Sequence, residues 1–249
     1  MANKVYVAKQ LSLLITAAVY AGAAAASPGA IDGTFGTGGV TLQPTQIEAN
    51  ALALQPDGKL VTAGYAAGTK GDTFALARFA ADGTPDDTFG IHGVATTAIG
   101  PGNSVAQALA VQPDGMLITA GYTFNGTDND IAVVRYDARG GVDRSFVGGG
   151  AVVHLGNGTD QAYALALMSD GRIIVAGTTQ TANGDLDFAV LRFLPNGLLD
   201  PTFGTDGVVT TAVSAGNDVA TAVVVQPDGK IVAAGYANNG NDYDFAIVR

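Results

Sequence analysis

The sequence contains no cysteine and no tryptophan, and only 14% of its residues are charged. Without cysteine the chain has no disulfide, no thiolate metal ligand, no cysteine nucleophile and no lipid attached at a signal-sequence cysteine. The two histidines, His92 and His154, stand at different positions of the repeat described below, and neither has partners at the spacing of a zinc site or a serine-type triad. The glycines fit hairpin turns, so no nucleotide-binding loop is found either.

A helical period of 3.6 residues is also missing after the first 26 residues. What the chain has instead is 35 glycines and 47% hydrophobic residues, with Val, Ala, Leu and Ile as the core candidates. Short strands joined by tight turns account for this composition, because β-branched residues favour strands and glycine favours turns. The sequence therefore predicts an all-β protein.

Residues 1–26 differ from the remainder of the chain. Lys4 and Lys9 precede an apolar run over residues 11–26, which ends in three alanines before Ser27. This is the pattern of a secretory signal peptide with a small-residue cleavage site. The alternative, a membrane anchor, is disfavoured because the strongly apolar part is shorter than the roughly 20 residues of a spanning helix. We expect export to the periplasm, the cell surface or the extracellular space, with the domain at residues 27–249 and no membrane span after cleavage.

The mature domain is acidic. Loss of the two lysines in residues 1–26 leaves 10 basic against 22 acidic residues, a net charge of −12. Such a surface repels a phosphate backbone, so nucleic acid is excluded as the expected partner.

Four copies of one unit, about 57 residues long, fill the domain. The same short apolar segment ends in an arginine four times, at Arg78, Arg135, Arg192 and Arg249. An Asp-x-x-Phe motif begins at Asp32, Asp86, Asp143 and Asp200. A turn motif, Gln-Pro-Asp-Gly in three copies and Met-Ser-Asp-Gly in the third copy, ends at Gly58, Gly115, Gly171 and Gly229. The units cover approximately residues 27–78, 79–135, 136–192 and 193–249.

Each unit can be divided into four strands, which in the last copy fall at 207–213, 219–225, 230–236 and 244–249. The turn at 227–229 joins the second strand to the third, and we expect Gly229→Val to cost more stability than Gly240→Val because that hairpin needs a positive φ. Four antiparallel strands per unit predict a β-propeller of four-stranded blades. A parallel β-solenoid is the competing architecture, but its coils lack a hairpin in every repeat.

The residues that carry a family resemblance are Leu-Asp-Pro-Thr-Phe-Gly at 199–204, Gln-Pro-Asp-Gly at 226–229, Ala-Gly at 234–235 and the strand that ends in Arg249. This pattern resembles the delta-60 repeat family, bacterial exported proteins thought to form β-propellers. The resemblance covers nearly all of residues 30–249 and implies a fold and an exported location, but no activity and no catalytic residues. Val147 replaces the Gly that follows Phe in this pattern. A closed ring of four blades, a half-ring completed by a second copy and part of a longer propeller all stay open.

Paired acids recur before the fourth strand, at Asp128 and Asp130, Asp185 and Asp187, and Asp242 and Asp244. Residues two apart in an extended segment point to the same side, so each pair can offer two oxygen ligands to Ca²⁺. The first copy has Gly71 and Thr73 there, which argues for solvated turn residues instead. Calcium is therefore a cofactor hypothesis, and no other cofactor is expected.

The repeated arginines and aspartates have two interpretations. One structural salt bridge per blade would join Arg78, Arg135, Arg192 and Arg249 to the aspartates of the Asp-x-x-Phe motifs. The alternative is a ring of arginines that faces an anionic ligand. No acid or histidine cluster is confined to one copy, so we expect a non-catalytic binding or scaffold module for a carbohydrate, peptide or protein partner. The alternative function is a propeller hydrolase or lyase that uses loop carboxylates with bound calcium.

Overall fold

The computed structural model describes residues 29–43, 47–156 and 158–249. The chain divides into two units, residues 1–32 and residues 33–249. In the first unit the described residues, 29–32, contain no strand, and the predicted signal peptide at residues 1–26 lies outside the described residues. Among the residues that the structure describes, no helix is long and apolar enough to cross a membrane.

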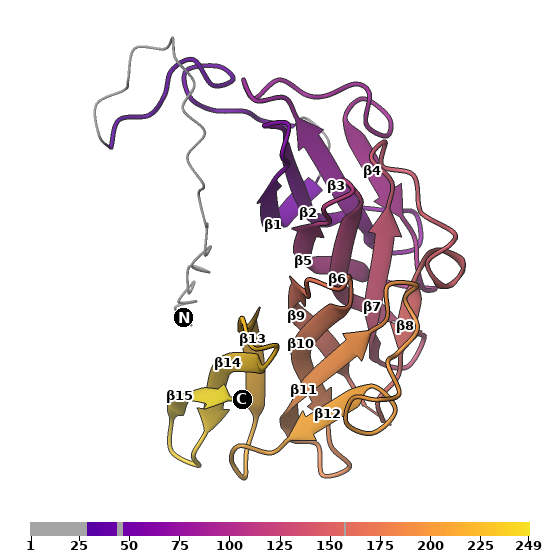
Figure 1. Cartoon of the computed structure of the whole chain (residues 1–249), viewed down its shortest axis with the longest axis vertical. Helices are drawn as coiled ribbons and strands as arrows, with labels where there is room; N and C mark the ends of the chain where they lie inside the picture. The colour runs from indigo at the N-terminus through magenta and orange to yellow at the C-terminus, as the bar shows by residue number, and fades with distance from the viewer. Residues whose placement is uncertain (1–28, 44–46, 157) are drawn as a thin grey trace. The chain divides into compact units, whose positions relative to one another are not determined.

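The second unit is an all-β propeller domain built from four antiparallel sheets, which we number as blades in chain order (Figure 1). Blade 1 contains β1 (Ile47–Leu54), β2 (Leu60–Ala66), β3 (Thr73–Phe79) and β4 (Val94–Thr97). Blade 2 contains β5 (Ser104–Val111), β6 (Leu117–Phe124), β7 (Asn129–Tyr136) and β8 (Ala151–Val153). Blade 3 contains β9 (Asp160–Leu167), β10 (Ile173–Gln180), β11 (Leu186–Phe193) and β12 (Val208–Thr211). Blade 4 has three strands, β13 (Asp218–Val225), β14 (Ile231–Asn238) and β15 (Tyr243–Val248).

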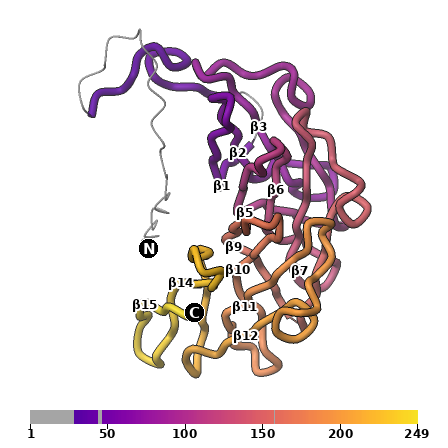
Figure 2. Tube along the Cα trace, viewed as in Figure 1, coloured from indigo at the N-terminus to yellow at the C-terminus, as the bar shows by residue number. Residues whose placement is uncertain are grey.

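The four strands predicted for the last copy are present, but the first of them belongs to a different blade from the one expected. In the second, third and fourth sequence units the first strand pairs with the third strand of the preceding sheet: β4 pairs with β3, β8 with β7 and β12 with β11. The expectation that one sequence unit forms one blade is therefore wrong by one strand. The cause is the path of the chain after the third strand of a blade. The loop that carries Asp-x-x-Phe turns back, so the strand that follows it lies at the outer edge of the same blade (Figure 2).

The blades stack through their first strands. β5 packs against β1, β2 and β3 of the preceding blade, and β9 and β13 pack in the same way on the blades before them. Three apolar clusters fill these junctions, one between each pair of successive blades. A single sheet of this size leaves both apolar faces open, so each blade is stabilised by its neighbours. The antiparallel ladders exclude the parallel solenoid.

A short 3₁₀ turn, Val147–Gly149, is the helical element of the described residues. It contains the Val that replaces Gly in the second copy, and Val147 has a φ of 43°, inside the left-handed region. The corresponding residues of two other copies, Gly90 and Gly204, have φ values of 57° and 54°. Because a β-branched side chain disfavours this conformation, Val147 is a strained position.

The hairpin glycines have the expected positive φ, but the glycine of the last loop shares it. Gly58, Gly115, Gly171 and Gly229 all have positive φ, between 81° and 86°. Gly240, in the last loop, has a φ of 98°, and neither Gly229 nor Gly240 has any atom within 4 Å of an added Cβ. The two substitutions to Val should therefore cost similar stability, contrary to the prediction that Gly229 is the more sensitive.

Candidate functional site

The repeated arginines and aspartates form an ion pair in each of the first three blades. Nε of Arg78 lies 2.8 Å from Oδ2 of Asp86, and the corresponding distances are 2.6 Å for Arg135–Asp143 and 2.8 Å for Arg192–Asp200. In each pair the guanidinium also lies over the Phe of the Asp-x-x-Phe motif, 4.6 to 5.0 Å from the ring centroid. The arginine is on the third strand of a blade and the aspartate on the loop that leads to its outer strand, so the pair holds that strand in place.

Two of these arginines also reach the next blade. Nη1 of Arg78 donates to the carbonyl oxygen of Ala138 at 2.5 Å, and Nη1 of Arg135 donates to the carbonyl oxygen of Pro195 at 2.8 Å. Each of these carbonyls belongs to the turn after the third strand of the following blade. In these two arginines the guanidinium group contacts an aspartate, a phenylalanine ring and a carbonyl oxygen of the next blade. These contacts within the fold favour the structural interpretation over a ring of arginines that binds an anion.

The environment of the three aspartates keeps them ionised. For Asp143 the Ser145 hydroxyl donates to the carboxylate and, with the Ser145 amide and Arg135, lowers the pKa. The Thr202 hydroxyl and amide, with Arg192, lower the pKa of Asp200 to about 2. Burial alone would raise the pKa of Asp86, but hydrogen bonds from Thr88 and Lys59 and the charge of Arg78 outweigh it and the pKa is lowered.

The fourth repeated arginine and the first aspartate of the Asp-x-x-Phe motifs lie toward the two ends of the sequence. Arg249 is the last residue of the sequence, and among the described residues it has no ion pair. Asp32 has the sequence position of Asp86 and takes part in an interaction of its own within the described residues.

The paired acids lie at the start of the third strand of a blade, which is the fourth strand of the sequence unit, and in two copies an asparagine holds them. Nδ2 of Asn125 donates to Asp128 at 2.6 Å and to Asp130 at 3.0 Å. Oδ1 of Asn125 accepts the amides of Thr127 and Asp128, which fixes the orientation of its side chain. An amide donor thus occupies the position between the two carboxylates where a cation would be coordinated, so this geometry also fits the interpretation as a closed turn.

The last copy repeats this arrangement, and the third departs from it. Nδ2 of Asn239 donates to Asp242 at 2.7 Å and to Asp244 at 2.8 Å. In the third copy burial raises the pKa of Asp187, with smaller contributions from Asp218 and Asp185. The calcium hypothesis stays a prediction for all three pairs.

His154 lies beside the acid pair of the second copy, Asp128 and Asp130. Nδ1 of His154 lies 2.7 Å from Oδ1 of Asp130, and the ligand atoms of Asp128, Asp130 and His154 all lie within 4.8 Å of one another. The hydrogen bond with Asp130 is the main reason that the pKa of His154 is raised. Sequence spacing missed this contact because His154 is on the outer-strand side of blade 2, where β8 runs beside β7.

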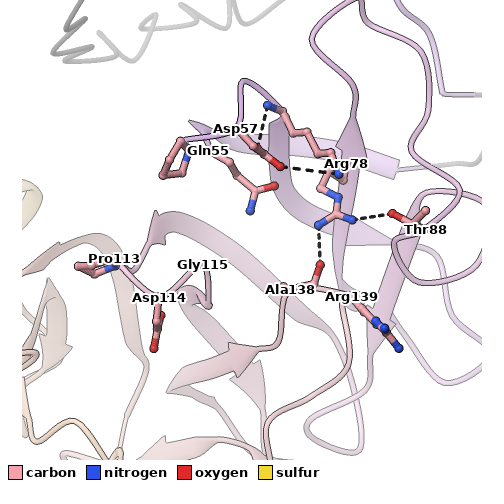
Figure 3. A pocket seen from close by; sticks show the side chains of 11 residues that line it. Gln55, Asp57, Arg78, Thr88, Pro113, Asp114, Gly115, Ala138 and Arg139 are labelled. Carbon is pink, nitrogen blue, oxygen red and sulfur yellow. Dashed lines mark hydrogen bonds and ion pairs between the residues drawn. The ribbon is translucent and has the colours of Figure 1, made fainter.

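Two pockets lie between blades 1 and 2, near opposite ends of β2. The first has a volume of about 490 Å³ and is lined by the hairpin turns of both blades and by Arg78, Thr88 and Arg139 (Figure 3). Figure 3 shows the Arg78 guanidinium directed to Thr88 and to the Ala138 carbonyl oxygen. Gln55, which is buried, also lines this pocket, and its Oε1 has no hydrogen-bond partner among the described residues.

The second pocket, of about 590 Å³, combines aromatic rings with side-chain amides and acids. The aromatic lining is Tyr65, Tyr122 and Phe124. The polar lining comprises Asn50, Asn103, Gln107, Asn129, Glu48 and Asp72. Neither the tyrosines nor the amides were among the site residues predicted from sequence. The available signal was the tyrosine that follows Ala-Gly in blades 1, 2 and 4, at Tyr65, Tyr122 and Tyr236.

Hydrogen bonds across the junction hold this second pocket in shape. Oδ1 of Asn103 accepts the amide of Asp72 at 3.0 Å, and Nδ2 of Asn50 donates to the carbonyl oxygen of Ala106 at 3.0 Å. A hydrogen bond with Glu48 is the main reason that the pKa of Tyr65 is raised to about 12, and burial raises the pKa of Tyr122. The Tyr65 hydroxyl therefore keeps its proton in the hydrogen bond with Glu48, and the Tyr122 hydroxyl stays protonated near neutral pH.

Among curated proteins, none matches the chain. Two solved structures are similar to it: a protein of unknown function from Bacteroides caccae, with 12% identity and a TM-score of 0.41, and a protein from Lactobacillus plantarum, with 14% identity and a TM-score of 0.32. The matches cover 82% and 81% of this chain, but only 60% and 55% of the other chains. The chain thus spans less than two thirds of the length of these two proteins.

The pattern of one family matches the repeats themselves. The matched segments are residues 55–89, 112–146, 169–203 and 226–249, and each of the first three begins in the turn between the first two strands of a blade and ends at the Phe of Asp-x-x-Phe. Together they make up just over half of the chain. The chain therefore belongs to the family described as a domain of unknown function (DUF5122) β-propeller.

Proposed function

We propose that this β-propeller domain is a non-catalytic binding module of the delta-60 type that acts outside the cytoplasm and takes a carbohydrate in the pocket of Tyr65 and Tyr122. The observation that carries the proposal is the composition of this pocket, in which two tyrosines stand among four side-chain amides and two acids. The repeat motifs and the signal-like pattern of residues 1–26 support the delta-60 assignment and the exported location.

The chemistry of the pocket suits a neutral sugar. A pyranose presents apolar C–H faces that pack on aromatic rings, and hydroxyl groups that both donate and accept hydrogen bonds. Tyr65 and Tyr122 offer ring faces, the Tyr122 hydroxyl is a donor, and the side-chain amides of Asn50, Asn103 and Asn129 add polar groups to the lining. Glu48 and Asp72 accept hydrogen bonds from sugar hydroxyls and disfavour anionic ligands.

A scaffold of rigid strands supports such a site. Tyr65, Tyr122 and Gln107 project from β2, β6 and β5, three strands that lie in two stacked sheets. Because strands position side chains more firmly than loops do, little ordering is needed when a ligand binds.

The alternative function, a hydrolase or lyase with bound calcium, has a narrower basis. It depends on the group of Asp128, Asp130 and His154, in which both carboxylates accept a hydrogen bond from Asn125. A release of reducing ends from a polysaccharide that requires added Ca²⁺ and disappears in Asp128→Ala/Asp130→Ala would support this alternative.

The binding proposal is tested by titrating the purified full chain with short neutral oligosaccharides, alongside short peptides, and following binding by calorimetry. We expect an oligosaccharide to bind, and Tyr122→Ala to weaken binding by at least about tenfold. Tyr236→Ala is the matched control, because it removes the same repeat position in blade 4, outside the pocket, and should leave the affinity unchanged. Equal loss in both variants, or binding of peptides alone, would refute a carbohydrate site at Tyr122.

A further inference from the structure

Each blade junction in this protein has two halves. The first half is a pair of apolar residues on the third strand of one blade, and the second half is a pair on the first strand of the next. Phe74 and Leu76 share a cluster with Leu109 and Val111. The second and third junctions repeat the arrangement, with Ile131 and Val133 beside Leu165 and Leu167, and with Phe188 and Val190 beside Val223 and Val225.

Both halves of one more junction are present on the molecule without a partner. The first half is on blade 4, where Phe245 and Ile247 have the repeat positions of Phe188 and Val190 and are 101% and 72% exposed. The second half is on blade 1, where Leu52 and Leu54 have the positions of Leu109 and Val111 and are 42% and 52% exposed. Within one chain, neither half covers the other.

The outer edge of blade 4 shows the same incompleteness. In the described part of the chain β15 pairs with β14 alone, whereas β3, β7 and β11 each have an outer strand on their free side. The segment that corresponds in sequence to those outer strands, residues 40–43, pairs locally with Gly36 and Thr37 and with no strand of a sheet among the described residues. An unpaired edge beside exposed apolar residues is a template for another strand.

The segment around residues 40–43 is already attached to blade 1 in the way that an outer strand is attached to the following blade. The amide of Gly36 donates to the carbonyl oxygen of Asp82 at 2.6 Å, as Gly90 does to Arg139 at 2.8 Å one repeat later. Thr41 adds a hydrogen bond to the Gly83 carbonyl oxygen at 2.7 Å. Residues 40–43 therefore flank the position beside blade 1 where a three-stranded sheet such as blade 4 would fit.

From these complementary surfaces we infer that two copies of this chain join end to end, with blade 4 of one copy packed on blade 1 of the other. Phe245 and Ile247 of one copy cover Leu52 and Leu54 of the second. Residues 40–43 of the second copy complete the sheet of β15 as its fourth strand. With a two-fold axis both junctions form at once, so a closed ring results and no edge is left.

Blades 1 and 3 share one register for the outer strand pair, whereas in blade 2 Ile131 pairs with Val153, one residue earlier in the repeat. We take the register of blades 1 and 3 for the new strand pair. Phe74 pairs with Thr97 and Phe188 with Thr211, while Leu76 pairs with Ala95. The same register places Phe245 opposite Gln43 and Ile247 opposite Thr41 of the other copy. Side chains on β15 then alternate correctly, with Phe245 and Ile247 on the buried face.

The test measures the mass of the purified full chain in solution by light scattering over a range of concentrations. We expect a dimer for the natural sequence, and monomers for Phe245→Asp and for Leu52→Asp, because each variant places a charge in both junctions. Leu198→Asp is the control: Leu198 is as exposed as Leu54 but has no part in the proposed interface, so its mass should not change. Circular dichroism checks that each variant is folded.

Mixing the variants gives the sharper result. An equimolar mixture of Phe245→Asp and Leu52→Asp should restore a dimer, because one junction between the two different variants contains neither substitution. A natural chain that stays monomeric at every concentration would overturn the inference. A dimer that survives both aspartate substitutions would equally exclude this interface.

Discussion

The third strands of blades 3 and 4 are nearly identical in sequence and opposite in environment. Phe188 in β11 is 1% exposed, whereas Phe245 in β15 is 101% exposed. Arg192 forms an ion pair with Asp200, whereas Arg249 has none among the described residues. The comparison shows that in a repeat protein the core is created by the next unit, so a residue's burial depends on its neighbour and not on its own motif.

The largest expected difference between the two blades is in the phenylalanines. Phe188→Ala removes a buried ring from the junction of blades 3 and 4 and should lower the free energy of unfolding by about 3–5 kcal/mol. Phe245→Ala should cost less than about 0.5 kcal/mol in dilute solution, where the ring is exposed. Denaturant unfolding of both variants measures the difference, and equal costs would mean that blade 4 is covered in solution.

Protein concentration separates the two phenylalanines further. If the junction between two copies forms, the cost of Phe245→Ala should rise as the protein concentration rises, while the cost of Phe188→Ala relative to the natural chain should not. A cost of Phe245→Ala that is independent of concentration would contradict the dimer.

The ion pairs should give the next largest effect. Within the described ranges Asp143 is paired with Arg135 alone, whereas Asp86 has a second cation in Lys59, at 3.0 Å, and Met116 occupies the corresponding place in blade 2. Arg135→Gln should therefore cost about 2 kcal/mol, because it leaves a partly buried carboxylate without a cation. The matched change Arg249→Gln should have almost no effect.

A second substitution tests the reason for this cost. Met116→Lys places a cation at the position of Lys59 and should recover part of the stability lost in Arg135→Gln, as measured by thermal unfolding. No recovery would show that the hydrogen bonds of Arg135 to Ser145 and Pro195 matter more than its charge.

Acid should weaken the blades that have these pairs before the blade that lacks one. Because the folded state lowers the pKa values of Asp86, Asp143 and Asp200, each stabilises the fold above the ordinary carboxyl pKa of about 3.9. That stability is lost as the pH falls from about 4 toward and below the pKa of Asp200, about 2. Burial raises the pKa values of Asp160 and Asp187. Each of these two groups therefore destabilises the fold when it ionises at higher pH.

Unfolding experiments across this pH range check the assignment. The free energy of unfolding should fall less steeply below pH 4 in Asp200→Asn than in the natural chain, since one linked proton has been removed. Arg249→Gln, in blade 4, is the control and should keep the natural slope, because it removes no carboxyl group. The same slope in all three proteins would contradict the role of Asp200.

Much of this fold could be predicted from the sequence, because it depends on local signals repeated four times. The hairpins at Gly58 and Gly229, the strand that ends in Arg192 and the four-stranded antiparallel blade are all consequences of turn chemistry and β-branched runs. The assignment of the outer strand was wrong because sequence periodicity fixes the length of a repeat and not its phase. Only the pairing of β12 with β11 reveals where a blade begins.

The candidate site was harder to predict for a related reason. The pocket of Tyr65 and Tyr122 is formed by two successive blades, and Asn103 and Asp72 come together there only through the junction. His154 likewise reaches Asp130 because β8 lies beside β7. No spacing along the chain indicates such contacts, which depend on how sheets pack and not on local propensity.

The smallest expected effect is a gain in stability, and it concerns a residue of blade 2 that differs from its counterparts in the neighbouring blades. Val147 has a φ of 43° where Gly90 and Gly204 have φ values of 57° and 54°, so Val147→Gly relieves strain and should stabilise the fold by about 1 kcal/mol. Gly204→Val, the reverse change in blade 3, should destabilise by more, since its Cβ would lie 2.1 Å from the carbonyl oxygen of Val208. Denaturant midpoints of the two variants measure both changes. A loss of stability in Val147→Gly would mean that the contacts of the valine side chain with the turn at Gly197 outweigh the strain of its backbone.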